Sequence, residues 1–144
     1  QLGNSSTTTY VYGTVQNRSD ERDKTSIRPT VLGLSFINSL TPIDYKWDLR
    51  EDYKIEGQHL EDVVKNGSKT RTRYHHGFSA QSINKVIKDT GVDFGGYQDH
   101  KIEGGNDVLS LGYDEFIAPL VKAVQELSTK INTLEQELNN IKGQ

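Results

Sequence analysis

The sequence predicts an α+β fold in which a small mixed domain carries a polar β-hairpin arm and a long C-terminal coiled-coil helix. Three patterns support this prediction. Residues 114–142 repeat apolar side chains at heptad spacing, Asn66-Gly67 is a two-residue hairpin signal, and residues 7–12 have the β-branched and aromatic side chains of a strand. We expect three parts along the chain: the end of a β-structured shaft at 1–18, the mixed domain at 19–113 and the coiled-coil helix at 114–144.

The composition limits the classes of function. The 144 residues carry a formal net charge of −3, so the chain has no basic excess for phosphates and we expect no nucleic-acid partner. Hydrophobic residues make up 33%, a low share that favours an elongated or oligomeric protein. Cys is absent, which excludes disulfides and thiolate chemistry. No apolar run approaches the ~20 residues that span a bilayer, so we expect no membrane partner.

The N-terminal residues have the chemistry of a strand without the means to fold alone. Residues 1–18 contain one charged residue, Arg18, and the breakers Gly3 and Gly13 flank the apolar stretch. An isolated strand or hairpin is marginal in water. The chain also lacks Met and the features of a signal peptide. We therefore interpret Gln1 as an internal position and residues 1–18 as the last rung of a shaft in a longer protein.

Two short helices are predicted within the mixed domain. In the segment from about Val31 to Asn38, Leu34 and Ile37 share a helical face, and Thr41-Pro42 stops the helix. A second helix is expected over 80–90, with Ser79 as its N-cap and Gly91 as its stop.

Three short strands and an arm complete the domain. We expect strands at 43–47, 97–102 and 107–111, and we place Trp47, the only tryptophan, in the core rather than at a ligand site. The stretch 50–74 carries little that a core could bury. It is interpreted as a protruding hairpin, or as a loop that becomes ordered only against a partner.

No metal or cofactor is expected. The pair His75-His76 invites a metal interpretation, but no Cys or matching carboxylate pattern accompanies it, so solvated or hydrogen-bonded histidines are favoured. The glycines that follow, at positions 95, 96, 104 and 105, lack the Gly-Lys-Ser/Thr sequence of a phosphate loop and are interpreted as turns.

The C-terminal repeat is the clearest signal. Its apolar residues follow an unbroken 3-4 spacing over about four heptads, which is typical of a coiled coil and narrower than the face of a helix packed on its own domain. Sequence alone does not decide the number of helices in the coil. The a and d positions are Ile117, Leu120, Val124, Leu127, Ile131, Leu134, Leu138 and Ile141.

A serine and a lysine lie five positions apart where the chain changes from uncharged to charged, at Ser19 and Lys24. A hydroxyl beside an amine can act as a nucleophile with its base. The alternative is structural: Ser19 or Asp20 caps a helix that begins at about Glu21. The spacing alone does not decide between them.

In combination, these segments resemble a known family. The start S-D-x-R-x-K at Ser19, Ile27 just after it, the Pro42 to Trp47 segment, a G-F-x-A-Q core and the terminal heptads are similar to the C-terminal intramolecular chaperone of phage tail spikes and fibres. This is the endosialidase type of autoprocessing peptidase, and the neck-appendage proteins of Bacillus phages look most similar. The resemblance covers residues 19–142.

The resemblance implies a homotrimer that helps its own N-terminal stalk to fold in the host cytoplasm, as the precursor of a virion component. The domain then cuts itself off at the Arg18–Ser19 bond, with Ser19 as nucleophile and Lys24 as base. Asp23 departs from the family's pattern, because an apolar or basic residue is expected there. A carboxylate beside a lysine favours the protonated amine, which is a poorer base. Alternatively, Asp20 or Asp23 orients the lysine or a water molecule.

Two other functions remain open from the sequence. One is a structural trimerisation cap with the same fold and no proteolysis. The other is a receptor-binding tip that uses the hairpin around Asn66-Gly67 as its contact.

Overall fold

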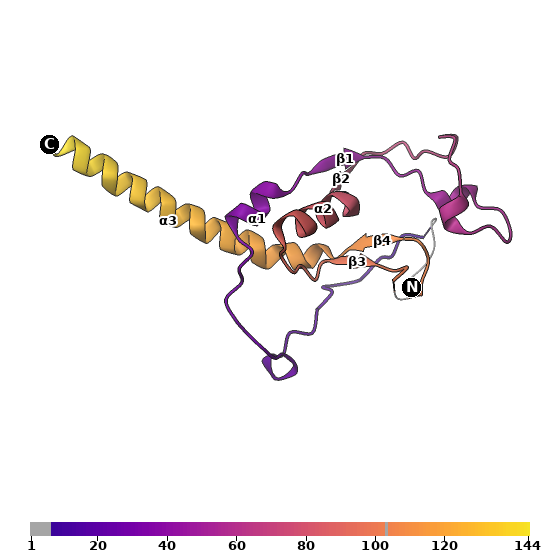
Figure 1. The fold of residues 1–144 in the computed structure, drawn as a ribbon, viewed down its shortest axis with the longest axis horizontal. Helices are drawn as coiled ribbons and strands as arrows, with labels where there is room; N and C mark the ends of the chain where they lie inside the picture. Colours follow the sequence, from indigo (N-terminus) through magenta and orange to yellow (C-terminus); the bar gives the residue numbers. More distant parts are fainter. Residues whose placement is uncertain (1–6, 103) are drawn as a thin grey trace. The chain divides into compact units, whose positions relative to one another are not determined.

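The computed structural model describes residues 7–102 and 104–144 (Figure 1). It divides into two compact units, residues 1–29 with 46–73 and residues 30–45 with 74–144. The helices and strands all lie in the second unit, and 3₁₀ turns occur at Glu21–Asp23, Arg50–Tyr53, Leu60–Asp62 and Tyr113–Phe116. In chain order the elements are α1 (Leu34–Ser39), β1 (Ile43–Tyr45), β2 (His75–Gly77), α2 (Ala80–Thr90), β3 (Tyr97–Asp99), β4 (Leu109–Leu111) and α3 (Ile117–Lys142).

The predicted α+β class is confirmed, with two small antiparallel sheets and a long C-terminal helix. In the first sheet β1 pairs with β2, and Ile43 lies opposite Gly77. In the second, β3 pairs with β4, and Tyr97 lies opposite Leu111. All three predicted strand regions form, each shorter than expected.

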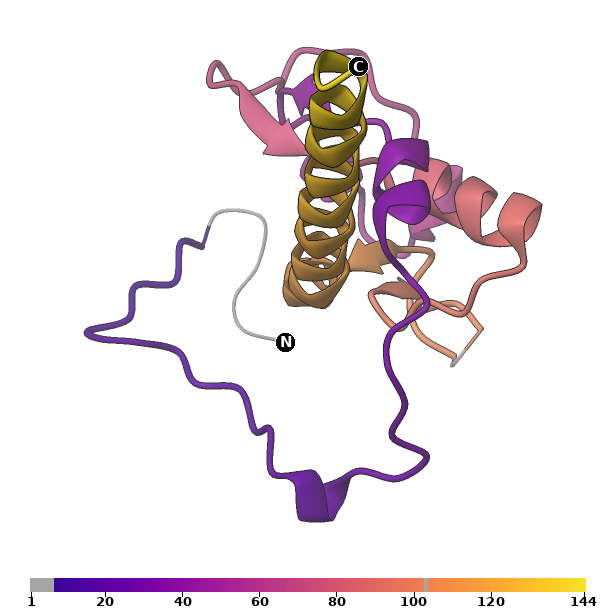
Figure 2. The same cartoon turned by 90° about the vertical axis from the view of Figure 1, so that its left-hand side faces the viewer.

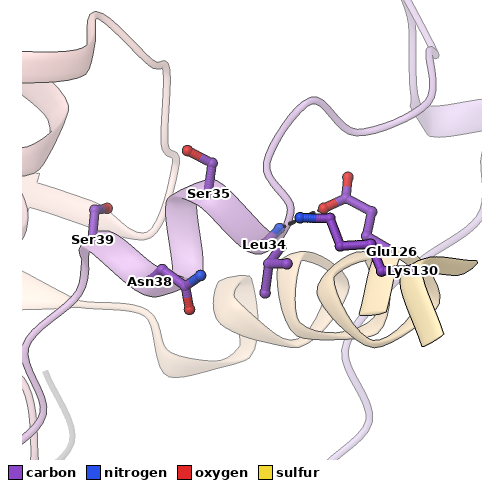
Figure 3. Close-up of a pocket in the computed structure, with 6 residues that line it drawn as sticks. All are labelled: Leu34, Ser35, Asn38, Ser39, Glu126 and Lys130. Atoms are coloured by element: carbon purple, nitrogen blue, oxygen red, sulfur yellow. Dashed lines mark hydrogen bonds between the residues drawn. The ribbon is translucent and has the colours of Figure 1, made fainter. Parts of the chain in front are cut away.

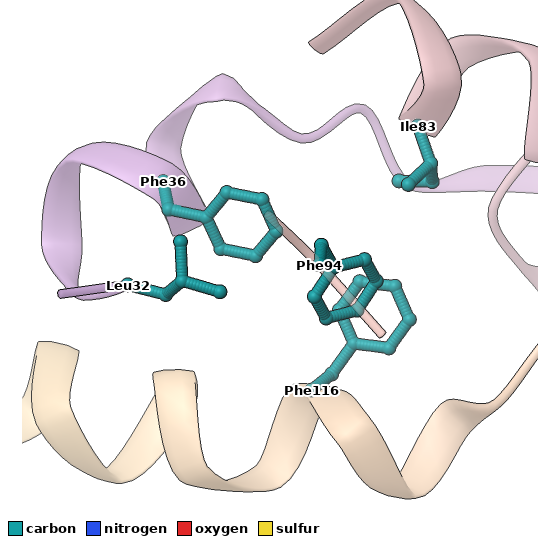
Figure 4. Packing of buried hydrophobic residues seen from close by; sticks show 5 residues of the cluster. All are labelled: Leu32, Phe36, Ile83, Phe94 and Phe116. Atoms are coloured by element: carbon teal, nitrogen blue, oxygen red, sulfur yellow. The ribbon is translucent and has the colours of Figure 1, made fainter. Parts of the chain in front are cut away.

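The core of the second unit is a small aromatic cluster (Figure 4). Phe94 lies at the centre, with its ring centroid 5.3 Å from that of Phe36 and 4.8 Å from that of Phe116. Leu32 and the fully buried Ile83 complete the cluster. Because Phe116 immediately precedes α3, this packing anchors the first turn of the long helix to the domain.

The helix α2 forms over the residues that its caps predict. The hydroxyl of Ser79 accepts a hydrogen bond from the backbone N–H of Ser82, and Gly91 ends the helix with a left-handed φ of 68°. The local sequence signals at both ends are therefore sufficient to define this element.

The helix α1 starts later than predicted, at Leu34 rather than Val31. The backbone N–H of Leu34 donates to Oε2 of Glu126 in α3, at 2.7 Å. The carboxylate of Glu126 thus accepts a backbone N–H of the first turn that has no partner within the helix, and it fixes where α1 begins. Sequence spacing could not reveal a partner that lies 92 residues away.

A close contact explains the glycine of the G-F-x-A-Q motif. The hydroxyl of Tyr113 accepts a hydrogen bond from the backbone N–H of Phe78 at 3.1 Å, and it occupies the space where a Cβ of Gly77 would lie. The ring of Tyr113 packs near Phe78 and Phe116, so its hydroxyl has little freedom to move away. A side chain at Gly77 would therefore displace this contact.

We expect Gly77→Ala to lower the free energy of unfolding by about 1–3 kcal/mol, the usual effect of overpacking a well-packed site. Urea unfolding measures it, with Gly143→Ala at the end of α3 as control. Placing Gly77→Ala in a Tyr113→Phe background should recover part of the loss, because the opposing oxygen is gone. A midpoint equal to that of the parent would show that the contact is not restrictive.

Two sequence-based expectations are corrected in the first unit. Residues 7–18 form no strand in the part of the chain that the structure describes, which agrees with the marginal stability of an isolated strand in water. Leu2 and Gly3 of the predicted shaft end lie outside the described residues. The side chain of Trp47 is not in the core but 43% exposed, because it lies beyond the end of β1.

The polar arm contains the predicted turn but no β-hairpin. Asn66 Oδ1 accepts from the backbone N–H of Ser68, and Gly67 has a left-handed φ of 79°. The flanking residues form no strand in the described range 46–73. Next to the turn, the backbone N–H groups of Ser68 and Lys69 donate to the side chains of Asn66 and Tyr53, and such bonds compete with ladder pairing.

Side chains of opposite charge hold the arm together. Asp48 receives the hydroxyl of Tyr53 at 2.7 Å and the ammonium of Lys65 at 3.2 Å. The same tyrosine hydroxyl accepts the backbone N–H of Lys69 at 2.7 Å, and the guanidinium of Arg71 lies 2.9 Å from the carboxylate of Asp52. The arm thus has internal order of its own, without a partner.

We expect acid to loosen the arm. The hydroxyl of Tyr53, with Lys65 in support, holds the pKa of the Asp48 carboxyl below its ordinary value of 3.8. A lowered pKa in the folded state stabilises the fold at neutral pH, and that contribution is lost as the pH falls below 3.8. Hydrogen-exchange protection of the Lys69 and Arg71 amides should then fall a few-fold, as for an exposed ionic contact.

The matched variant is Asp48→Asn, which should show the same loosening already at neutral pH and little further change in acid. Glu56→Gln, in the same arm, is the control. Equal protection in Asp48→Asn and the parent at neutral pH would contradict this role of Asp48.

Candidate functional site

A single 3₁₀ turn builds the site around Ser19. The Asp20 carboxylate caps the turn by accepting the backbone N–H of Arg22 at 2.9 Å, so the predicted cap at Asp20 is confirmed. The backbone N–H of Asp23 donates to the carbonyl of Asp20, and that of Lys24 donates to the carbonyl of Glu21. The turn therefore reverses the chain and directs residues 23 and 24 back toward residues 18 and 19.

The turn brings Ser19 and Lys24 together. Lys24 Nζ lies 2.8 Å from Ser19 Oγ and 3.2 Å from the Ser19 carbonyl oxygen. This is hydrogen-bond distance between a hydroxyl and an amine, the geometry that a nucleophile needs toward its base. The two contacts place the amine beside the backbone that follows Arg18.

Two ion pairs flank the hydroxyl and the amine. Arg22 donates from Nε and Nη2 to both carboxylate oxygens of Asp20, and these bonds hold the pKa of the Asp20 carboxyl below its ordinary value of 3.8. Arg18 Nη2 lies 2.7 Å from Asp23 Oδ2. The two carboxylates that the sequence placed near Lys24 thus bind arginines. This pairing depends on side-chain directions that spacing does not reveal.

The site lies at the surface of the single chain. The Ser19–Lys24 hydrogen bond is exposed, and the side chain of Arg18 is 81% exposed. In general a lysine acts as a base only where burial or a nearby positive charge lowers its pKa. The single chain therefore brings the Ser19 hydroxyl and the Lys24 amine into contact but does not bury them.

The heptad side chains of α3 form a second candidate surface, here called the heptad stripe. Their exposed fractions run from 44% at Leu127 to 68% at Ile141. A different face of α3, with Pro119 and Ala123, is buried. Viewed along the helix, α1 and α2 lie on the same side of α3 (Figure 2). The stripe is therefore not used for packing within its own domain.

A sequence model of one known family matches residues 19–92, just over half of the chain, and the match begins at Ser19. The family is described as the chaperone of endosialidase. The chain belongs to this family. No curated protein matches it. Membership gives this chaperone-of-endosialidase domain an intramolecular chaperone role in a phage tail protein.

Other polar groups of the domain have structural partners. His76 Nδ1 lies 2.6 Å from Asp44 Oδ1 across the first sheet, and His100 Nε2 lies 2.8 Å from Ser110 Oγ. In the described ranges 7–102 and 104–144, no group of three or more His, Cys, Asp or Glu side chains could hold a metal ion. Within the same ranges, no helix is long and apolar enough to cross a bilayer.

A shallow pocket lies between α1 and α3 (Figure 3). Its principal polar contact is internal, because the carboxylate of Glu126 already accepts the backbone N–H of Leu34. We therefore assign it to helix packing. The lining residues are Leu34, Ser35, Asn38, Ser39, Glu126 and Lys130.

Proposed function

We propose that this chaperone trimerises, assists the folding of a phage tail-fibre or appendage stalk, and then releases itself by cutting the Arg18–Ser19 bond. It acts during virion assembly in the host cytoplasm, and its partners are two further copies and its own N-terminal stalk. The observation that carries the cleavage proposal is the 2.8 Å contact between Lys24 Nζ and Ser19 Oγ.

The chemistry follows from the position of the serine directly after the bond. Ser19 Oγ attacks the carbonyl carbon of Arg18 through a five-membered ring, while Lys24 takes the hydroxyl proton. The C–N bond breaks, the proton passes to the freed amino group of Ser19, and an ester replaces the amide. Water then hydrolyses the ester, which leaves a carboxylate on Arg18 and restores the Ser19 hydroxyl. Each chain reacts once.

Assembly supplies what the single chain lacks. The amine needs a desolvated setting to act as a base, and the site is exposed in one copy. Three domains brought together by the heptad stripe can bury the cleavage region. In a parallel, in-register coil, Lys130 faces Glu135 and Glu137 faces Lys142 of a neighbouring helix, and both pairings are attractive. The 26 residues of α3 make a helix of about 39 Å.

A time course on a denaturing gel tests this function. The freshly assembled protein should lose its full-length band and gain two products. A non-cleaving trimerisation cap would keep one band indefinitely. A receptor-binding tip would remain attached in mature particles, so the same gel run on virions separates that alternative from a released chaperone.

A further inference from the structure

Two side-chain contacts of equal span close the segment around the proposed cut. Arg18 pairs with Asp23, and Ser19 pairs with Lys24. Asp23 and Lys24, consecutive residues at the end of the turn, therefore contact the two residues on either side of the proposed cut. In the proposed reaction the Ser19–Lys24 contact takes part directly, whereas the ion pair between Arg18 and Asp23 does not.

Of the two aspartates in the turn, Asp23 is the one whose carboxylate binds Arg18. Asp20 is engaged by Arg22 through both of its oxygens and also caps the turn, so it is committed elsewhere. The backbone bond from Asp23 to the carbonyl of Asp20 fixes the place of Asp23 in the turn. Its carboxylate reaches the guanidinium of Arg18 at 2.7 Å.

We propose that Asp23 is a positioning residue for self-cleavage, and that the chain selects a basic residue before the cut. By holding the Arg18 side chain, Asp23 restricts rotation of the residue whose carbonyl Ser19 attacks. The reacting atoms then spend more time in an attack geometry. This inference rests on the proposed self-cleavage and adds to it a residue outside the Ser19–Lys24 pair.

The solvent exposure of the ion pair sets how much Asp23→Asn should slow cleavage. The side chains of Arg18 and Asp23 are 81% and 45% exposed, so water and salt weaken their attraction. We expect Asp23→Asn to slow cleavage about two- to fivefold at low ionic strength, the range for an exposed ion pair. At ~0.5 M salt the difference from the parent should nearly vanish, because the Debye length is then shorter than ~5 Å.

A double-mutant cycle on the assembled protein tests the proposal, with the cleavage rate read from denaturing gels. Asp23→Asn, Arg18→Gln and the double variant should be equally slow, because each removes the same contact. Asp23→Glu should restore part of the rate. Glu21→Gln, which alters a neighbouring carboxylate outside the pair, is the matched control and should cut at the parent rate. Sedimentation checks that every variant assembles.

Two outcomes would overturn the positioning role. One is an Asp23→Asn rate equal to the parent at low salt. The other is an Asp23→Asn effect that persists undiminished when residue 18 is already Gln, because Asp23 would then act independently of Arg18. Failure of the self-cleavage itself looks different: the parent stays whole, or Ser19→Ala is cut like the parent. An uncut parent would overturn both proposals.

Discussion

Ser19→Ala is expected to abolish cleavage at the Arg18–Ser19 bond and to leave an assembled protein with its N-terminal segment attached. In the proposed mechanism the Ser19 hydroxyl forms the ester, and no other group on residue 19 can replace it. The side chain makes no contribution to the core cluster, so folding should be unaffected. Lys24→Ala should slow or stop the reaction, because the Ser19 hydroxyl loses its proton acceptor.

Denaturing gels over time and sedimentation of the same samples measure both effects. Thr25→Ala is the matched control, since it alters a hydroxyl next to Lys24 and should cut at the parent rate. Efficient cutting of Ser19→Ala would refute the mechanism, whatever the behaviour of the other variants.

Changing Ile131 and Leu134 together to serine is expected to give a monomer that does not cut itself. These residues are one a and one d position of the heptad stripe, 54% and 63% exposed in the single chain. Each such side chain contributes about 1.5–3 kcal/mol when buried. In the proposed trimer, losing both layers in all three chains exceeds the stability that a modest coil provides. Without assembly the Ser19–Lys24 contact then stays exposed to water.

The control for this variant changes Asn132 and Gln136, which lie off the stripe on the same helix, to serine. That protein should assemble and cut like the parent. Sedimentation equilibrium and gels give the two readouts, and circular dichroism checks that the domain stays folded. A monomer that still cuts at the parent rate would show that each chain completes its own site, and the coil would then serve alignment alone.

Elements with local signals were predictable from the sequence. The helix α2 carries its cap at Ser79 and its stop at Gly91, and both act as expected. The helix α3 was predictable because a heptad repeat sets its own period over many turns. The five-residue spacing of Ser19 and Lys24 did not by itself predict their contact, which only the family resemblance favoured over a capping role for Ser19.

Features that depend on distant partners were not predictable. The start of α1 is set by Glu126 of α3, which no local pattern indicates. The arm carries a hairpin signal at Asn66-Gly67, yet the flanking residues Lys65 and Lys69 bond to the side chains of Asp48 and Tyr53 instead of pairing as strands. The pairing of Asp23 with Arg18 rather than with Lys24 likewise depends on side-chain directions. In each case the deciding interaction depends on a residue that is distant in the sequence or on the rotamer of a side chain.

The most direct test of self-cleavage is the intact mass of the freshly assembled protein, followed by sequencing of its new N-terminus. Self-cleavage at the Arg18–Ser19 bond gives a fragment of residues 19–144 that begins with the free amino group of Ser19, and an N-terminal product that ends in the carboxylate of Arg18. A single uncut mass after assembly, or a fragment that begins at any residue other than Ser19, would contradict it.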